Sequence, residues 1–215
     1  MSLTTAAPSS PSHQPEASGA DGLLIESGAP FRLDLTSWAL RRRPDNSVDR
    51  WDGNAYRRVL LVGEEPVPVS MKQNGPPDAP RLAVKLGRGL TDQQTKELAG
   101  SALDRMFGLS VDLSGFAAMA NEDLLLGPLA APMRGLKPPR FATLFEALVN
   151  AVACQQLSLT VGIQLLNRLT AAHGRGGSEV PDSPRAFPAP RAARKRAAKP
   201  TEAPWLQPCQ GPHDR

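Results

Sequence analysis

The chain has 215 residues, a net charge of +4 and an apolar content of 40%, which is below the roughly 45–50% of an average globular protein. Its 22 prolines are about twice the usual share, which indicates that part of the chain does not fold. The sequence shows no signal peptide and no run long enough to span a membrane. Cys154 and Cys209 lie far apart and form neither a disulfide framework nor a metal-ligand spacing. We therefore expect a cytoplasmic protein with a folded middle.

The N-terminal half predicts an antiparallel sheet. Residues 1–22 contain almost no large apolar side chain, so we expect them to be disordered. Between Leu23 and Gly87 apolar and polar residues tend to alternate, which is typical of strands, and we expect strands at 31–35, 56–62 and 81–86. We assign residues 23–90 to a small antiparallel β domain.

Turn-forming residues divide this half into strands. The Asp52–Gly53 pair lies between two apolar runs and is a strong signal for a hairpin. Pro66 and Pro68 cannot donate a backbone hydrogen bond, so they predict an edge strand. Residues 74–80 predict a loop.

The apolar period changes after Gly89. Thr91 is placed to cap a helix over residues 92–106, and shorter helical turns are expected at 114–119 and 121–128. We therefore expect a helical region to follow the sheet.

Two helices with a corner between them are predicted over residues 140–172. The first has one apolar face, made of Phe141, Leu144, Phe145, Leu148, Val149 and Val152. This pattern stops at 154–157, and Ser158 is placed to cap the second helix. Gly174 is placed to end it. The side chains expected to point inward from the second helix are Leu159, Ile163, Leu166 and Leu169.

The C-terminal tail differs in composition from the rest. Beyond Val180 proline recurs too often for a helix, and residues 191–199 are a basic run with only Ala between the charges. We therefore expect residues 181–215 to be a disordered, basic tail that packs poorly.

Several segments resemble the helix-hairpin-helix family of base-excision DNA glycosylases. Residues 145–158, which read Phe-Glu-Ala-Leu-Val-Asn-Ala-Val-Ala-Cys-Gln-Gln-Leu-Ser, resemble the opening of its helical domain. Residues 135–137 resemble its lead-in, and residues 187–190 its Phe-Pro-x-Pro loop. Residues 43–49 and 56–60 resemble the N-terminal domain of the bacterial 3-methyladenine glycosylase II type. The resemblance implies an α+β fold in which the sheet domain precedes the first helices of an all-α domain, over residues 91–180.

The resemblance also implies DNA-binding residues. Enzymes of this family flip a damaged base out of double-stranded DNA, and a wedge side chain fills the vacated space. By position the wedge would be Gln156, with Gln155 supporting the turn. Ser158, which caps the next helix, is expected to bind DNA together with them. Arg43 matches an arginine near the lesion pocket. The alternatives are an ordinary polar helix corner and an ordinary surface arginine. We expect a monomer that binds damaged DNA, without a metal, a cofactor or a membrane.

The catalytic carboxylate of the family has no match in this sequence. The family places an Asp after the hairpin, in a Gly-rich aromatic stretch, to stabilise the charge that develops on the sugar. Asp182 lies in a Pro-Asp-Ser-Pro turn and does not fit that role. The iron–sulfur cluster of some relatives needs four cysteines, and the chain has two. We therefore expect a DNA glycosylase of the 3-methyladenine type that is truncated and inactive as given.

The tail allows a further interpretation. Back-translated and read one nucleotide later, residues 204–214 can encode Gly-Phe-Ser-Arg-Ala-Lys-Ala-Arg, which resembles the hairpin motif of the family. This favours a frameshift over a genuine tail. Two other functions stay open, a non-catalytic DNA-binding module and a non-functional remnant. The lesion preference does not follow from these residues.

Overall fold

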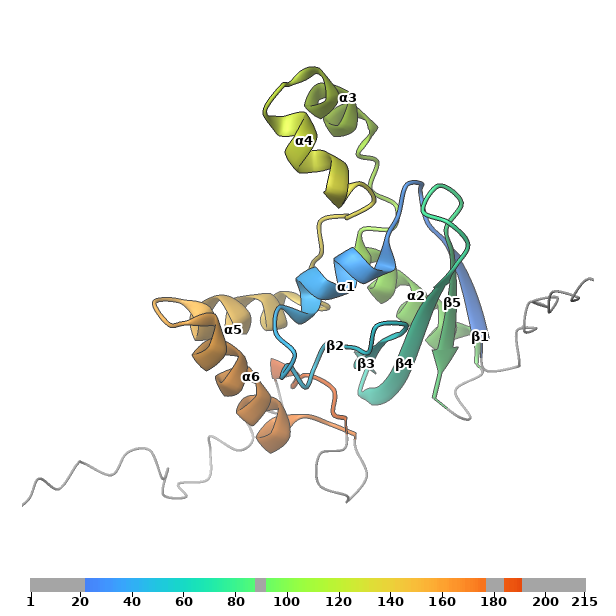
Figure 1. Ribbon diagram of the computed structural model, residues 1–215. Helices are drawn as coiled ribbons and strands as arrows, with labels where there is room; N and C mark the ends of the chain where they lie inside the picture. Colours follow the sequence, from blue (N-terminus) through green and yellow to red (C-terminus); the bar gives the residue numbers. More distant parts are fainter. Residues whose placement is uncertain (1–21, 88–91, 177–183, 191–215) are drawn as a thin grey trace, which may run out of the picture.

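The computed structural model describes residues 22–87, 92–176 and 184–190, and over these the chain has the expected α+β fold (Figure 1). The antiparallel sheet has the order β1-β5-β4-β3-β2. Its strands are β1 (Gly22–Glu26), β2 (Arg50–Trp51), β3 (Tyr56–Val62), β4 (Glu65–Asn74) and β5 (Arg81–Leu86). The helices are α1 (Leu33–Arg41), α2 (Gln93–Phe107), α3 (Ser114–Glu122), α4 (Leu126–Ala130), α5 (Leu144–Cys154) and α6 (Leu159–His173), with a short 3-10 turn, η1, at Ala131–Met133.

The segment that begins at Leu33 is a helix, and the strand expected at residues 31–35 is wrong. Leu33, Thr36, Ser37 and Leu40 are buried along α1, and this spacing is that of one helical face. Leu35, which completed the alternation in the sequence, is only partly buried. Residues 31–35 alone fit both the strand period and the helix period. The longer run of buried residues, which extends to Leu40, fits the helix period.

The hairpin predicted at Asp52 and Gly53 is confirmed. Trp51 pairs with Tyr56 across β2 and β3. The Asp52 carboxylate accepts hydrogen bonds from the backbone N–H groups of Asn54 and Ala55, at 2.9 and 2.7 Å. This contact satisfies the turn locally, which is why the short-range signal was sufficient. The loop expected at residues 74–80 also joins β4 to β5.

The strand that carries Pro66 and Pro68 lies in the middle of the sheet, so the expected edge strand is wrong. β4 pairs with β3 from Glu65 to Met71, but its pairing with β5 begins only at Val69. The carbonyl of Pro68 accepts from the N–H of Gly87 at 2.8 Å. The two proline nitrogens therefore face the side on which β5 has ended, where no hydrogen-bond donor is needed.

The main hydrophobic core lies between the sheet and α2. Ala99, Leu103, Met106 and Phe107 of α2 are fully buried, and the Phe107 ring meets the Tyr56 ring edge-on at 4.8 Å. The N-cap of α2 is Asp92, whose carboxylate accepts from the N–H of Thr95 at 2.8 Å. The cap expected at residue 91 lies outside the described residues. The division of the chain at residue 90 stays a prediction, and α2 shares its core with the sheet.

Helices α3 and α4 stand apart from the sheet and from α5 and α6 (Figure 1). The base of this helical hairpin is fastened by Lys137, which is 2% exposed. Its ammonium group donates to the carbonyls of Leu109 and Val111 at 2.8 and 2.7 Å. The hairpin itself exposes large apolar side chains, among them Leu124, Leu125 and Leu129.

A second apolar cluster joins α5 and α6 to the loop before β2 and to the segment 184–190. Val48, Ile163, Leu166 and Phe187 are its buried members. The expectation that the chain packs poorly beyond residue 181 is therefore wrong for 184–190. Ala186 forms an isolated bridge with Arg175, in which its backbone N–H donates to the Arg175 carbonyl. This is possible because Ala186 lies between Pro184 and Pro188 and keeps its own N–H. Residues 181–183 and 191–215 lie outside the described part.

Gly174 ends α6, as the sequence predicts. A Cβ atom at this position would lie 2.4 Å from the Thr170 carbonyl oxygen and 2.6 Å from that of Ala186. The conformation of Gly174 is extended, which any residue can adopt. Glycine is therefore required here because other backbone atoms approach closely. Neither oxygen is the end of a flexible side chain that could move aside.

We expect Gly174→Ala to destabilise the fold by about 1–3 kcal/mol, the usual cost of inserting a methyl group into filled space. Gly115→Ala is the matched control, because nothing lies within 4 Å of a Cβ atom at that position of α3. The control should be neutral or slightly stabilising. Urea unfolding of both variants measures the difference, and equal midpoints would contradict the expected crowding.

Candidate nucleic-acid interface

The predicted corner between two helices is confirmed at residues 155–158. α5 ends at Cys154 and α6 begins at Leu159. Gln155 is extended, and Gln156 has a φ of 58° in the left-handed region, which non-glycine residues seldom adopt. The Ser158 hydroxyl accepts from the N–H of Val161 at 3.3 Å and caps α6. The corner is thus a tight turn with a defined backbone, and all four of its residues are exposed.

The two helices approach closely behind this corner because of Gly162. A Cβ atom there would lie 2.7 Å from the Cys154 sulfur and 3.1 Å from the Ala153 carbonyl oxygen. Any larger residue at position 162 would push α6 away from the last turn of α5. The glycine therefore sets how sharply the chain turns at the corner.

The face that α5 buries differs from the one that the sequence predicts. Phe145 and Val149 pack on the second apolar cluster, as expected. Leu144, Leu148 and Val152 point outward and are 76%, 58% and 71% exposed, so the expectation is wrong for them. The side chains turned toward the sheet and α1 are instead the polar Glu146 and Asn150, together with Cys154.

Helix α6 follows its prediction more closely. Ile163 and Leu166 are buried, and Leu169 is partly buried against the same cluster. Leu159 is 43% exposed, so its expected inward position is wrong, because it lies in the first turn beside the open corner. The Asn167 side chain holds the loop before β2 through the Asp45 carbonyl at 2.7 Å.

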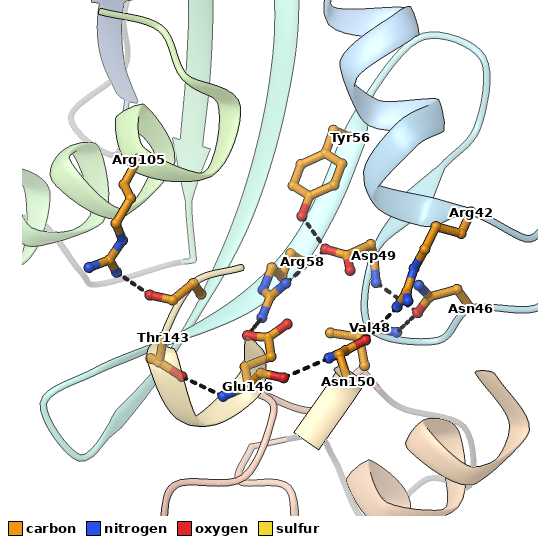
Figure 2. Close-up of polar contacts among 11 residues, drawn as sticks. Arg42, Asn46, Val48, Asp49, Tyr56, Arg58, Arg105, Thr143, Glu146 and Asn150 are labelled. Carbon is orange, nitrogen blue, oxygen red and sulfur yellow. Dashed lines mark hydrogen bonds and ion pairs between the residues drawn. The ribbon is translucent and has the colours of Figure 1, made fainter. Parts of the chain in front are cut away.

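A buried group of charges fastens α5 to the sheet (Figure 2). The Arg58 guanidinium on β3 donates to Asp49 at 2.8 Å and to Glu146 at 2.5 Å. Tyr56 donates its hydroxyl proton to the same Asp49 oxygen at 2.5 Å. All four side chains are almost fully buried. Ion pairs this deep are weakly screened by solvent, and their partners cannot be replaced by water.

Burial and charge shift the titration of these groups in definite directions. Burial raises the pKa of Glu146, and the neighbouring Arg58 opposes that rise. Burial by itself would lower the pKa of Arg58, but Glu146 and Asp49 outweigh it and hold that pKa well above its usual value. Burial, and then the charge of Asp49, hold the pKa of Tyr56 well above its usual value. Arg58 is therefore charged and Tyr56 neutral at neutral pH.

A second arginine holds the other end of α5. Arg42 follows the last residue of α1 and has a φ of 59°. Its guanidinium donates to the side-chain oxygen of Asn150 at 2.6 Å and to the Cys154 sulfur at 3.7 Å. It also lies over the Phe141 ring, 5.6 Å from the ring centre. The turn of α5 that precedes the corner is thus tied to the end of α1.

The structure brings together three of the four residues that the resemblance singled out. Gln155, Gln156 and Ser158 share the exposed corner. Arg43 lies elsewhere and pairs with Asp45 at 3.0 Å, with its side chain 36% exposed. The neighbouring Arg42, not Arg43, reaches α5. The roles of wedge, turn support and lesion-pocket residue stay predictions.

No sequence pattern predicted a role for Arg42, Asp49, Arg58 or Glu146. One signal was present, because Thr143 and Glu146 have the spacing of a capping box. Thr143 does cap α5, accepting from the N–H of Glu146 at 3.1 Å. The Glu146 carboxylate binds Arg58. A Glu followed four residues later by Asn, within an otherwise apolar helix, was the second signal for a buried polar face.

Two other features, a membrane-spanning helix and a cluster of metal ligands, are absent from the described residues. No helix of this part is long and apolar enough to cross a membrane. Nor does any group of three or more His, Cys, Asp or Glu side chains in the described ranges have the geometry to hold a metal ion.

The fold matches solved structures of DNA glycosylases, although no protein-family profile and no curated sequence matches the chain. A 3-methyladenine DNA glycosylase from Archaeoglobus fulgidus is 18% identical and has a TM-score of 0.66, covering 80% of this chain and 58% of its own. MBOgg1 in complex with a low-affinity DNA ligand is 17% identical, with a TM-score of 0.58 over 82% and 54% of the two chains.

An 8-oxoguanine glycosylase/lyase from Clostridium acetobutylicum, in complex with double-stranded DNA containing cytosine opposite 8-oxoguanine, is 15% identical. Its TM-score is 0.57, and the match covers 79% of this chain and 52% of that one. The chain thus spans a little over half the length of each glycosylase. Over this matched part, the chain shares its fold with solved DNA glycosylases.

Proposed function

We propose that the chain is a DNA-repair glycosylase component that binds double-stranded DNA containing a damaged base through the corner 155–158. The observation that carries the proposal is Gln156, an exposed amide held in the left-handed region within a tight turn. A side chain presented in this way is fitted to enter a base stack. The similarity to glycosylases solved with DNA supports the same assignment.

Alkylated bases are the proposed lesion class. The first support is the resemblance of the N-terminal segments to the 3-methyladenine type. The second is the higher TM-score of the 3-methyladenine glycosylase, 0.66 against 0.57 for the 8-oxoguanine glycosylase/lyase. Breaking the glycosidic bond requires a carboxylate placed at the sugar. No segment of this sequence matches the Gly-rich aromatic stretch that carries this carboxylate in the family. We therefore assign to these residues the binding part of the reaction.

The test compares DNA binding by two glutamine variants. We expect Gln156→Ala to lower the preference for a duplex with one abasic site, relative to an intact duplex, by about tenfold. The reason is that a side chain filling the vacated space replaces stacking that is worth ~1–3 kcal/mol per base. The stability of the fold should not change, because the Gln156 side chain is exposed.

Gln164→Ala is the matched control, since Gln164 is also exposed but lies in the middle of α6. It should bind both duplexes as the unmodified chain does. Fluorescence anisotropy with labelled duplexes at fixed salt gives the two affinities, because phosphate contacts alone depend steeply on salt. An unmodified chain that binds neither duplex, or both equally, would contradict the proposed function.

A further inference from the structure

The end of α5 is held by apolar packing on one side and by polar contacts on another. The stripe formed by Leu144, Leu148 and Val152 is exposed, so no described residue supports α5 from that side. The apolar side chains of Val149 and Ala153 pack against the second apolar cluster. On the side turned toward the sheet and α1, the helix rests on polar contacts. Glu146 is bound by Arg58 near the start of the helix, and Asn150 and Cys154 are bound by Arg42 near its end.

The Arg42 guanidinium makes three contacts that together hold the end of α5. The planar guanidinium reaches the Asn150 oxygen with one nitrogen and the Cys154 sulfur with another, while its face lies over Phe141. Asn150 is 4% exposed and donates its own N–H to the Glu146 carbonyl at 2.9 Å. These contacts link the end of α1 to the last two turns of α5. The next residue along the chain is Gln155, the first of the corner.

We propose that Arg42 is a positioning residue, which fixes the last turn of α5 and thereby holds the corner 155–158 in the geometry that binds DNA. This inference rests on the proposed function. Arg42 then acts through Asn150 and Cys154 and does not itself contact a DNA phosphate. Lysine cannot replace it, because an ammonium group cannot bind two acceptors in a plane and stack on a ring at once.

Cys154 provides a direct readout of this contact. In a Cys209→Ser background it is the remaining cysteine of the chain, so its rate of labelling by an aromatic disulfide reagent reports the opening of the last turn of α5. We expect Arg42→Met to raise this rate about tenfold, because it removes hydrogen bonds made by a charged group. DNA affinity, measured with the abasic duplex, should fall by about the same factor.

Three further variants separate positioning from charge and from loss of fold. Arg42→Lys keeps the charge and should still behave like Arg42→Met. Asn150→Ala removes the buried acceptor without changing any charge and should reproduce both effects, so it decides the matter if Arg42→Met does not fold. Arg134→Met removes a charge from an exposed pair with Asp78 and should change neither the labelling nor the affinity by as much as twofold.

Wild-type affinity in Arg42→Lys together with weak binding by Arg42→Met would show a direct phosphate contact and overturn the proposal. Unchanged labelling of Cys154 in both Arg42→Met and Asn150→Ala would also overturn it. If the unmodified chain did not bind the abasic duplex, the proposed function would fail. The labelling rates would then decide by themselves whether Arg42 fixes the end of α5.

Discussion

Replacing Arg58 with methionine should lower the free energy of unfolding by about 3–5 kcal/mol, a large part of the roughly 5–15 kcal/mol that stabilises a typical domain. The side chain is 2% exposed and binds two carboxylates, Asp49 and Glu146. Methionine has a comparable side-chain volume, so the loss is one of charge more than of packing. Both carboxylates would stay buried without a cation, and burial penalises them strongly.

The matched control is Arg57→Met. Arg57 is the neighbouring residue on β3, and it forms an exposed ion pair with Asp52 on the other face of the sheet. Solvent screens that pair, so the urea midpoint of the control should move little. Similar losses in the two variants would contradict the structural role assigned to the buried group.

The loss in Arg58→Met should depend on pH. Burial raises the pKa of Glu146, and Arg58 is the group that opposes that rise. Without Arg58 the carboxyl group binds its proton more readily in the folded chain than in the unfolded one. Stability that depends on this proton is present at acid pH and is lost as the pH rises. The difference between Arg58→Met and the unmodified chain should therefore be smallest at acid pH.

Local signals predicted the local parts of the fold. The hairpin followed from Asp52 and Gly53, and the corner followed from Ser158, because in each case a polar side chain satisfies backbone groups within three residues of itself. α1 was mistaken for a strand because alternation over five residues does not exclude a helix. Ala186 was placed in an unstructured tail because proline content says nothing about a single bridge to Arg175.

The buried face of α5 depends on partners that are distant in the sequence. Arg58 and Glu146 are 88 residues apart, and Arg42 and Asn150 are 108 residues apart. No periodicity within α5 reveals where those arginines lie. The apolar pattern therefore predicted a single buried stripe, whereas the helix is rotated so that its polar residues meet the arginines and Leu148 faces outward.

Alkaline pH should unfold the chain through its single tyrosine. Tyr56 is fully buried and donates its hydroxyl proton to Asp49 at 2.5 Å. Burial first, and then the charge of Asp49, hold its pKa well above the usual value of about 10. Above that pH an unfolded chain loses the tyrosine proton and a folded chain retains it. The stability that depends on this proton is complete below about pH 10 and is lost as the pH rises, by ~1.4 kcal/mol per pH unit.

Two measurements check this expectation. Since the chain has one tyrosine, the ultraviolet absorbance of tyrosinate reports Tyr56 alone, and it should appear only together with loss of helical circular dichroism. Urea unfolding of Tyr56→Phe is the control, because all other titrating groups are common to both chains. At neutral pH the variant should be less stable, since it lacks a hydrogen bond to a charged acceptor worth about 1.5–3 kcal/mol. That deficit should shrink steadily above about pH 10, because only the unmodified chain loses stability through tyrosine ionisation. Tyrosinate absorbance that rises near pH 10 in a chain that is still folded would show that Tyr56 is not buried against Asp49.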